Sequence, residues 1–169
     1  MKNVILITLM FFVSFLSFSQ NVTQYLNPVS SPQASVSQNV GMTNISIDYS
    51  SPGIKGRQVF GNLVPYDQLW RAGANSPTFI KFSTNVTIGD KTLRAGDYAI
   101  AITPRKDSKW TIDLNSAGKY PFAYMLGGKL DIEAYNKDLA VSFDVNPEYW
   151  DNDTSIERLK YIIDANDNK

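Results

Sequence analysis

The chain has 169 residues, with no cysteine, no histidine and 16 basic residues against 16 acidic ones, which fits one modest domain. The missing cysteines exclude disulfides, thiolate nucleophiles and Cys-based metal sites, and the missing histidines exclude a Ser-His-Asp triad and an HExxH metal site. Carboxylates, hydroxyls, amines and guanidinium groups remain to carry any chemistry.

The first 19 residues have the pattern of a signal peptide. Lys2 precedes an apolar run of about 15 residues, Val4 to Phe18, which is shorter than the roughly 20 residues of a membrane-spanning helix. Ser17 and Ser19 supply the small residues of a cleavage site before Gln20, and an uncleaved anchor is the alternative. We expect an exported protein, periplasmic or extracellular, with no transmembrane segment in the mature chain.

The mature chain is almost neutral. Removing Lys2 with the leader leaves 15 basic residues (16 minus 1) against 16 acidic ones. Binding to nucleic acid or to an anionic membrane surface usually needs a concentrated basic patch, so we expect no nucleic-acid partner.

The mature chain begins with a polar arm and a hairpin. Residues 20–34 are polar, contain two prolines and show no apolar period, so we expect a flexible arm. From residue 35 the pattern alternates, with a strand ending at Val40, a turn at 41–43 and a second strand at 45–49. Alternation of this kind predicts a hairpin with one buried face.

Residues 51–77 form a long irregular stretch with four glycines and three prolines. A loop of this length without a period is uncommon, and its apolar content is too high for disorder. We expect an ordered loop, with one helical turn near 67–70.

Short strands follow at intervals of about ten residues, separated by Gly or Pro turns, and favour an antiparallel β-sandwich of jelly-roll or Ig-like type. We expect strands at 79–82, 86–88, 92–93, 98–102, 110–114, 130–135 and 139–145, with a turn at 136–138. A single domain would then span residues 35–169.

The chain is expected to end in a short amphipathic helix at about residues 155–164. Thr154 or Ser155 can cap it, and Ile156, Leu159, Ile162 and Ile163 fall on one helical face. The helix would cover one end of the sandwich, and a tail that docks on a partner is the alternative.

The long loop at residues 51–77 also holds the candidate binding residues. Arginine beside aromatic rings can stack and can bind a carboxylate or a planar ligand. The alternative is structural, with Tyr66 and Trp70 in the core and Arg71 paired to a carboxylate such as Asp67 or Asp48 while its guanidinium also satisfies loop carbonyls. The predicted ligand-binding residues are Lys55, Arg57, Tyr66, Trp70, Arg71 and Asn75.

Catalysis by paired carboxylates needs neither histidine nor cysteine. The candidates are Asp48, Asp67, Asp97, Asp113, Asp131, Glu133 and Asp144, but turn and surface roles explain most of them and the sequence brings no pair together. The acidic run 151–153 lacks the ligand spacing of a calcium loop, and no phosphate-binding or dinucleotide motif occurs. We expect no catalytic residue, no metal and no cofactor.

Three segments resemble a known family: SPQASVSQNVG at 31–41, IDYSSPGIKGRQVFGNLVPYDQLWRAGAN at 47–75, and TIGDKTLRAGDYAIAITPRKDSKWTIDLN at 87–115. Over about residues 31–115 the chain resembles the secreted bacterial proteins grouped as domain of unknown function 2911. The resemblance implies a secreted β-rich domain and no established activity. It fades after Asn115, so residues 120–169 are interpreted as a variant ending.

Two positions depart from the family pattern. An arginine usually follows the Tyr-Ser pair, where this chain has Ser51, and an acidic residue usually follows Gly-Ala-Asn, where it has Ser76. If those two charges serve a shared site, the resemblance implies that the site is altered here.

Three functions remain open. The first is a non-catalytic binding or accessory module for a small molecule, a glycan or an envelope protein, using the loop 55–75. The second is a carboxylate-based hydrolase acting on glycan or envelope material. The third is a structural envelope or assembly protein. The balance leans away from an enzyme.

Overall fold

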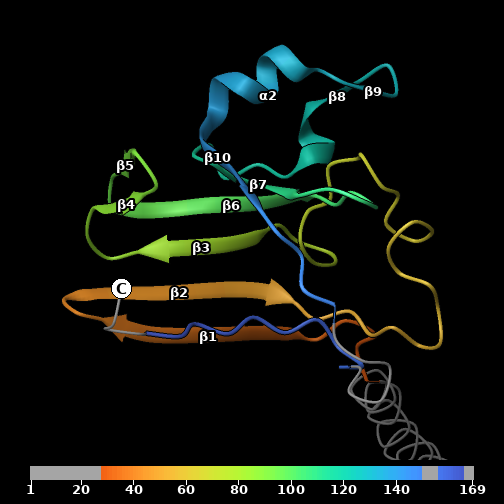
Figure 1. Ribbon diagram of the computed structural model, residues 1–169, viewed down its shortest axis with the longest axis horizontal. Helices are drawn as coiled ribbons and strands as arrows, with labels where there is room; N and C mark the ends of the chain where they lie inside the picture. The colour runs from red at the N-terminus through yellow and green to blue at the C-terminus, as the bar shows by residue number, and fades with distance from the viewer. Residues whose placement is uncertain (1–27, 150–155, 166–169) are drawn as a thin grey trace, which may run out of the picture. The chain divides into compact units, whose positions relative to one another are not determined.

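The main sheet is an antiparallel meander of six strands in the order β1-β2-β3-β6-β7-β10 (Figure 1). A computed structural model of the chain describes residues 28–149 and 156–165, and the compact unit that contains the sheet begins at Ser31. The predicted signal peptide and the acidic run 151–153 therefore lie outside the described residues. The strands are β1 Gln33–Val40, β2 Thr43–Ser50, β3 Thr78–Phe82, β6 Gly96–Thr103, β7 Trp110–Asn115 and β10 Leu139–Val145.

Besides the long loop between β2 and β3, two insertions with secondary structure of their own interrupt the meander. A hairpin of β4 (Val86–Ile88) and β5 (Lys91–Leu93) separates β3 from β6. Residues 116–138, here called the helical insert, separate β7 from β10 and stand beyond β7 in Figure 1. The insert contains η3 Pro121–Tyr124, β8 Met125–Leu126, β9 Lys129–Leu130 and α2 Ile132–Asp138.

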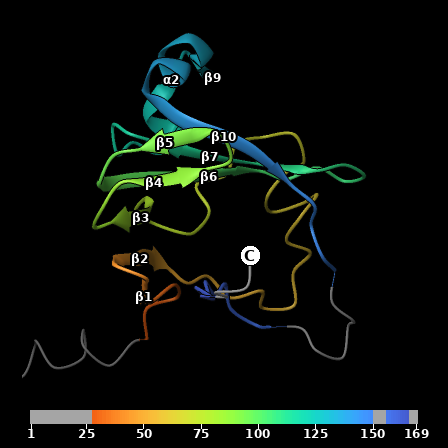
Figure 2. The ribbon, with the colours of Figure 1, turned by 60° about the vertical axis from the view of Figure 1, so that its left-hand side comes forward.

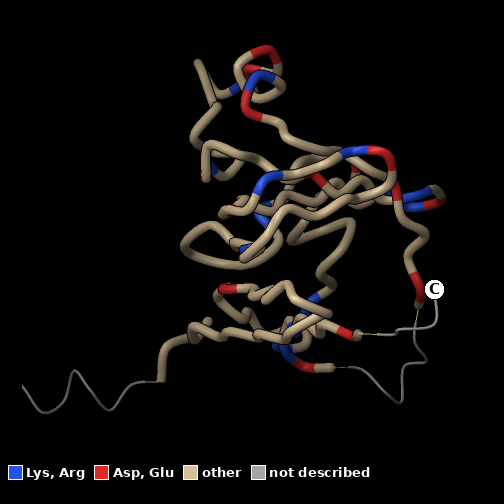
Figure 3. Tube along the Cα trace, turned by 90° about the vertical axis from the view of Figure 1, so that its left-hand side faces the viewer, with Lys and Arg blue, Asp and Glu red and all other residues tan. Residues whose placement is uncertain are grey.

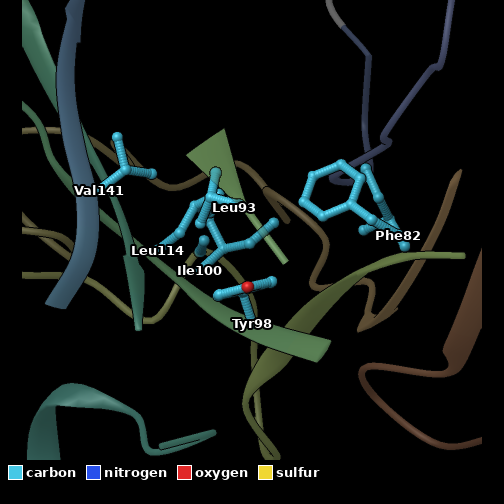
Figure 4. Packing of buried hydrophobic residues seen from close by; sticks show 8 residues of the cluster. Phe82, Leu93, Tyr98, Ile100, Leu114 and Val141 are labelled. Carbon is cyan, nitrogen blue, oxygen red and sulfur yellow. The ribbon is translucent and has the colours of Figure 1, made fainter. Parts of the chain in front are cut away.

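One face of the sheet, the inner face, carries the hydrophobic core. The register places Val36, Ile47 and Ile80 opposite one another on β1, β2 and β3, so the apolar positions of successive strands fall on the same side. Leu93 of the β4–β5 hairpin packs against this face. Figure 4 shows Leu93 with the other labelled side chains of the buried cluster. The buried cluster consists of Ile47, Ala72, Phe82, Leu93, Tyr98, Ile100, Leu114 and Val141.

The C-terminal segment 156–165 is not helical, so the prediction of a helix at 155–164 is wrong over the part that the structure describes. The segment is extended and runs against the start of the long loop, where Leu159 N donates to Pro52 O at 3.0 Å. The Tyr161 ring meets Tyr49 edge-on at 4.8 Å, and its hydroxyl donates to Ala72 O at 2.6 Å. Burial raises the pKa of the Tyr161 hydroxyl, which keeps it protonated as a donor.

Residues 130–135 also differ from the prediction, because α2 replaces the expected strand and its end replaces the turn at 136–138. Asp131 Oδ1 accepts a hydrogen bond from Ala134 N at 3.0 Å and caps the helix. Glu133 and Lys137 form an i,i+4 ion pair at 3.2 Å.

The loop between β2 and β3 is ordered as expected but has no helical turn near 67–70. Trp70 instead pairs with β6, since Trp70 N donates to Ile102 O at 2.7 Å and Ile102 N donates back to Trp70 O at 2.8 Å. These two bonds fasten the middle of the loop to the end of the sheet.

The protein is mainly β, with one six-stranded sheet, two two-stranded sheets and one short helix among the described residues (Figures 1 and 2). A second large sheet that would close a sandwich is not shown in the described residues. Basic and acidic residues are both spread over the described part of the chain (Figure 3). In that part of the chain, no helix has the length and apolarity needed to span a bilayer.

Candidate functional site

The opposite, outer face of the sheet holds a pocket of about 420 Å³. This volume lies within the range of small-ligand sites, about 300–1,000 Å³. The residues that line it, here called the outer-face pocket, come from β1, β2, the end of the long loop and β3. They are Gln33, Ala34, Ser35, Asp48, Tyr49, Ser50, Ser76, Pro77 and Phe79.

Strand register explains why these residues meet. The two-residue turn at 41–42 pairs Val40 with Thr43, which sets Ser35 opposite Asp48. Asp48 in turn lies opposite Phe79 of β3. Directly opposite residues of antiparallel strands project from the same face. A hydroxyl, a carboxylate and an aromatic ring therefore form one row across the outer face.

Beyond Phe79, this row of opposed residues continues across the sheet and becomes buried. Phe79 pairs with Ala99, which pairs with Asn115, and both of these partners are only 1% exposed. A methyl group built on Gly118 would meet the Phe79 ring at 3.3 Å, so the backbone of the helical insert lies against this ring. Phe79 thus marks the border between the open and the covered halves of the outer face.

The polar side chains of the pocket lack partners within the protein. Among the described residues, the side chains of Gln33, Ser35, Asp48 and Ser76 form no hydrogen bond and no ion pair. Their donors and acceptors are available to water or to a ligand. Asp48 is the one ionisable carboxylate in the described lining, and no lysine or arginine belongs to it.

The six sequence-predicted site residues are not brought together in one place. Lys55 and Arg57 are exposed where the C-terminal segment crosses the loop. Lys55 N donates to Glu157 Oε1 at 3.0 Å. The Arg57 guanidinium donates to Gly53 O at 2.7 Å and to the carbonyl of the following residue at 3.0 Å. Arg57 therefore satisfies loop carbonyls.

Tyr66 and Trp70 lie at a different part of the loop. The Tyr66 ring covers Gly61, where a Cβ would approach Tyr66 Cε2 to 2.6 Å. The Trp70 ring meets Phe60 edge-on at 5.9 Å, and Phe60 in turn meets Trp110 at 4.6 Å. Both side chains are half-buried. Tyr66 packs within the loop, whereas Trp70 connects the loop through Phe60 to Trp110 of β7.

Arg71 and Asn75 lie nearest to the outer-face pocket. Arg71 Nη1 donates to Asn75 O at 2.8 Å, and the next residue, Ser76, lines the pocket. The half-buried guanidinium also lies over the rings of Tyr120 and Phe122, at 5.8 and 5.2 Å from their centroids. These contacts hold the cation beside the pocket but outside its lining.

A second polar cluster lies under the helical insert. Tyr135, 2% exposed, donates its hydroxyl to Asp113 Oδ2 at 2.9 Å, while Asp113 Oδ1 is buried without a partner among the described residues. Burial and the neighbouring carboxylate raise the pKa of the Tyr135 hydroxyl, so it remains a donor. The pair joins α2 to β7.

The same insert holds a cavity of about 400 Å³ near Asp138. The Asp138 carboxylate accepts from the Tyr124 hydroxyl at 2.7 Å and from Lys119 Nζ at 3.1 Å. These two bonds lower the pKa of Asp138, with the tyrosine as the larger cause, and burial with the Asp138 bond raises the pKa of Tyr124. The polar groups here already satisfy one another.

The remaining acidic candidates are scattered. Asp67 lies 3.8 Å from Arg105, Asp97 pairs with Lys81 at 3.2 Å, and Asp144 accepts from Thr111 at 2.7 Å. In residues 28–149 and 156–165, no group of three or more acidic side chains is placed to hold a metal ion.

The two departures from the family pattern occupy different environments. Ser51 is buried, its hydroxyl donates to Leu159 O at 2.7 Å, and its carbonyl accepts from Arg158 Nη1 at 3.0 Å. Ser76 is exposed and lines the outer-face pocket. The first serine thus anchors the C-terminal segment, and the second borders the candidate site.

Sequence reasoning missed most of the pocket. Asp48 belongs to the predicted acidic candidates and to the structural alternative for Arg71, whereas Gln33, Ser35 and Phe79 belong to no predicted site. The turn at 41–42 was the available signal, because a two-residue turn fixes which residues of the two strands are opposite.

Comparison with known proteins places the chain in a family. No curated protein and no solved structure matches it. The family described as "Protein of unknown function (DUF2911)" matches residues 31–169, which extends the resemblance through the segment interpreted as a variant ending. The chain therefore belongs to the DUF2911 family over its whole described sheet, its helical insert and its C-terminal segment.

Proposed function

We propose that the chain is an exported, non-catalytic binding module that takes a small ligand in the outer-face pocket. The pocket carries the proposal because four of its polar side chains have no partner among the described residues. A folded protein usually satisfies its polar groups internally or leaves them to solvent on convex surface, whereas these converge on a concavity. The end of the loop 55–75, with Arg71 and Asn75, forms the margin of the site.

Export rests on the leader pattern of residues 1–19. Expression of the full chain in a Gram-negative host should give a periplasmic or secreted product that begins at Gln20. A cytoplasmic product that retains Met1 would contradict export while leaving the binding proposal intact.

A hydrolase would need more acidic groups in the same pocket than a binding module needs. Glycosidase chemistry needs two carboxylic groups facing each other, about 5–9.5 Å apart. Asp48 is the one carboxylate in the described lining. Binding requires no second acidic group, so we favour it over catalysis.

The binding proposal can be tested with a chemically mixed fragment library screened by ligand-observed NMR against the chain from Gln20 onward. Ser35→Tyr fills the pocket from an exposed position on the edge strand β1, without removing a hydrogen bond. Ser142→Tyr is the matched control, since Ser142 is exposed on the other edge strand, β10. We expect hits that disappear with Ser35→Tyr and persist with Ser142→Tyr. Hits insensitive to both substitutions, or no hits, would refute the proposed site.

A further inference from the structure

We infer that the ligand of the outer-face pocket is an uncharged glycan, a step that rests on the proposed function. The lining combines three serines, one glutamine amide and one carboxylate with the rings of Pro77 and Phe79. A sugar ring has the matching chemistry, with hydroxyl groups around its rim and C–H groups on its faces.

The polar groups fit a ligand that both donates and accepts hydrogen bonds. Asp48 accepts only, the Gln33 amide does both, and the hydroxyls of Ser35 and Ser76 rotate to do either. A ligand that satisfies this mixed set must itself carry several hydroxyl groups. An apolar ligand would leave these groups desolvated without partners, which costs about 1–3 kcal/mol for each buried one.

Asp48 occupies the centre of this set. Its register partners are Ser35 on one side and Phe79 on the other. Two adjacent sugar hydroxyls can donate to the two oxygens of one carboxylate, and hydrogen bonds to a charged acceptor are stronger than those between neutral groups.

Phe79 supplies the apolar surface beside that carboxylate. The face of an aromatic ring is negative and its edge positive, so the weakly positive C–H groups of a sugar face pack favourably against it. The backbone at Gly118 lies against one edge of the Phe79 ring and limits its movement. The ring is therefore held in place before a ligand arrives, which lowers the entropic cost of binding.

The charges of the lining favour an uncharged sugar over an acidic one. Asp48 is negative, and the two neighbouring cations are outside the lining and have partners of their own. Lys81, two residues beyond Phe79 on β3, pairs with Asp97 at 3.2 Å, and Arg71 donates to Asn75 O. A uronic acid or a sulfated sugar would bring a second negative charge next to Asp48 without a cation in the described lining to neutralise it.

The inference can be tested by isothermal calorimetry and NMR titration with neutral pentasaccharides of glucose, xylose, mannose and N-acetylglucosamine, and with oligogalacturonate as the acidic arm. We expect at least one neutral oligosaccharide to bind and oligogalacturonate to bind at least tenfold more weakly. Asp48→Asn should weaken neutral binding about tenfold, because a hydrogen bond to a charged group is worth about 1.5–3 kcal/mol.

Matched variants separate the site from general effects. Asp107→Asn makes the same charge change in an exposed turn and should leave affinity unchanged. Phe79→Leu should also weaken binding, and Ser35→Tyr should abolish it without altering the fold.

The outcomes distinguish this inference from the proposed function. If fragments of other chemistry bind in a Ser35-dependent manner while no neutral oligosaccharide binds, the glycan inference is wrong and the binding site stands. If oligogalacturonate binds as tightly as the neutral sugars, or if Asp48→Asn leaves affinity unchanged, the inference is also overturned. If neither fragments nor sugars bind, the proposed function itself fails.

Discussion

Removing the Tyr135 hydroxyl should destabilise the protein more than a surface tyrosine substitution does. The hydroxyl is the described partner of the Asp113 carboxylate, at 2.9 Å, and Asp113 is 6% exposed. Because Asp113 Oδ1 has no partner among the described residues, Tyr135→Phe leaves the whole carboxylate buried without a described hydrogen bond. The ring of residue 135 and its edge contact with Tyr124 at 5.2 Å would be retained.

The expected loss in the free energy of unfolding follows from the cost of leaving a buried acceptor without a hydrogen bond. Leaving a buried acceptor unsatisfied costs about 1–3 kcal/mol, and more for a charged group, so we expect about 3 kcal/mol. At roughly 3 °C per kcal/mol for a chain of about 150 residues, Tm should fall by about 9 °C.

Urea denaturation followed by far-UV circular dichroism measures this loss. Tyr149→Phe is the control, since Tyr149 is 70% exposed, and it should lie within about 0.5 kcal/mol of wild type. The double variant Tyr135→Phe/Asp113→Leu removes both polar partners and should recover part of the lost stability. A Tyr135→Phe protein as stable as the control variant would refute the view that this pair ties α2 to β7.

Three further predictions concern other parts of the fold. Tyr161→Phe keeps the ring but loses the bond to Ala72 O, and should lower the free energy of unfolding by about 1 kcal/mol in the same assay. Gly61→Ala should cost more than 1 kcal/mol, because Gly61 has φ +85° and its new Cβ would approach Tyr66 Cε2 to 2.6 Å; a wild-type Tm would contradict this strain. The pKa of Asp138 is lower in the folded state than in the unfolded chain, so its carboxylate stabilises the fold above pH 4 or so. That contribution is lost as the pH falls further through the lowered folded pKa, and Asp138→Asn should therefore flatten the fall in stability below about pH 5, whereas parallel curves for the variant and the wild type would contradict it.

The strands could be predicted from the sequence because each has one face in the core. Ile45, Ile47 and Tyr49 alternate with polar residues, and all three contribute to the inner face. The same alternation identified β6, β7 and β10. What it could not supply was the sheet order across the loop 51–77, because that pairing depends on contacts far apart in the chain.

The helix lies in a different segment from the predicted one because apolar alternation hides the capping signal at Asp131. Leu130 and Ile132 alternate like a strand, but Asp131 before a first turn that contains Glu133 is a helix start. The C-terminal segment shows the reverse error. Its isoleucine spacing is typical of a helix, whereas Leu159, Tyr161, Ile163 and Ala165 alternate with exposed residues, and all four lie half-buried.

The candidate site was only partly accessible to sequence reasoning. Arg71 and Asn75 were singled out, and they border the pocket. The opposition of Ser35 and Asp48 could have been read from the turn at 41–42, but the position of Phe79 beside them depends on β2–β3 pairing across a long irregular loop. Arginines and aromatic rings in one loop are typical of a binding site, but most of these side chains hold the loop in place.

The central claim is that the outer-face pocket is where this protein binds its ligand. Backbone amide shifts of the ¹⁵N-labelled chain, recorded during titration with the best-binding fragment or oligosaccharide, test it most directly. The account predicts that the largest shifts fall on residues 33–35, 48–50 and 76–79 and vanish in Ser35→Tyr. Shifts centred on the helical insert or on segment 156–165, unchanged by Ser35→Tyr, would contradict it.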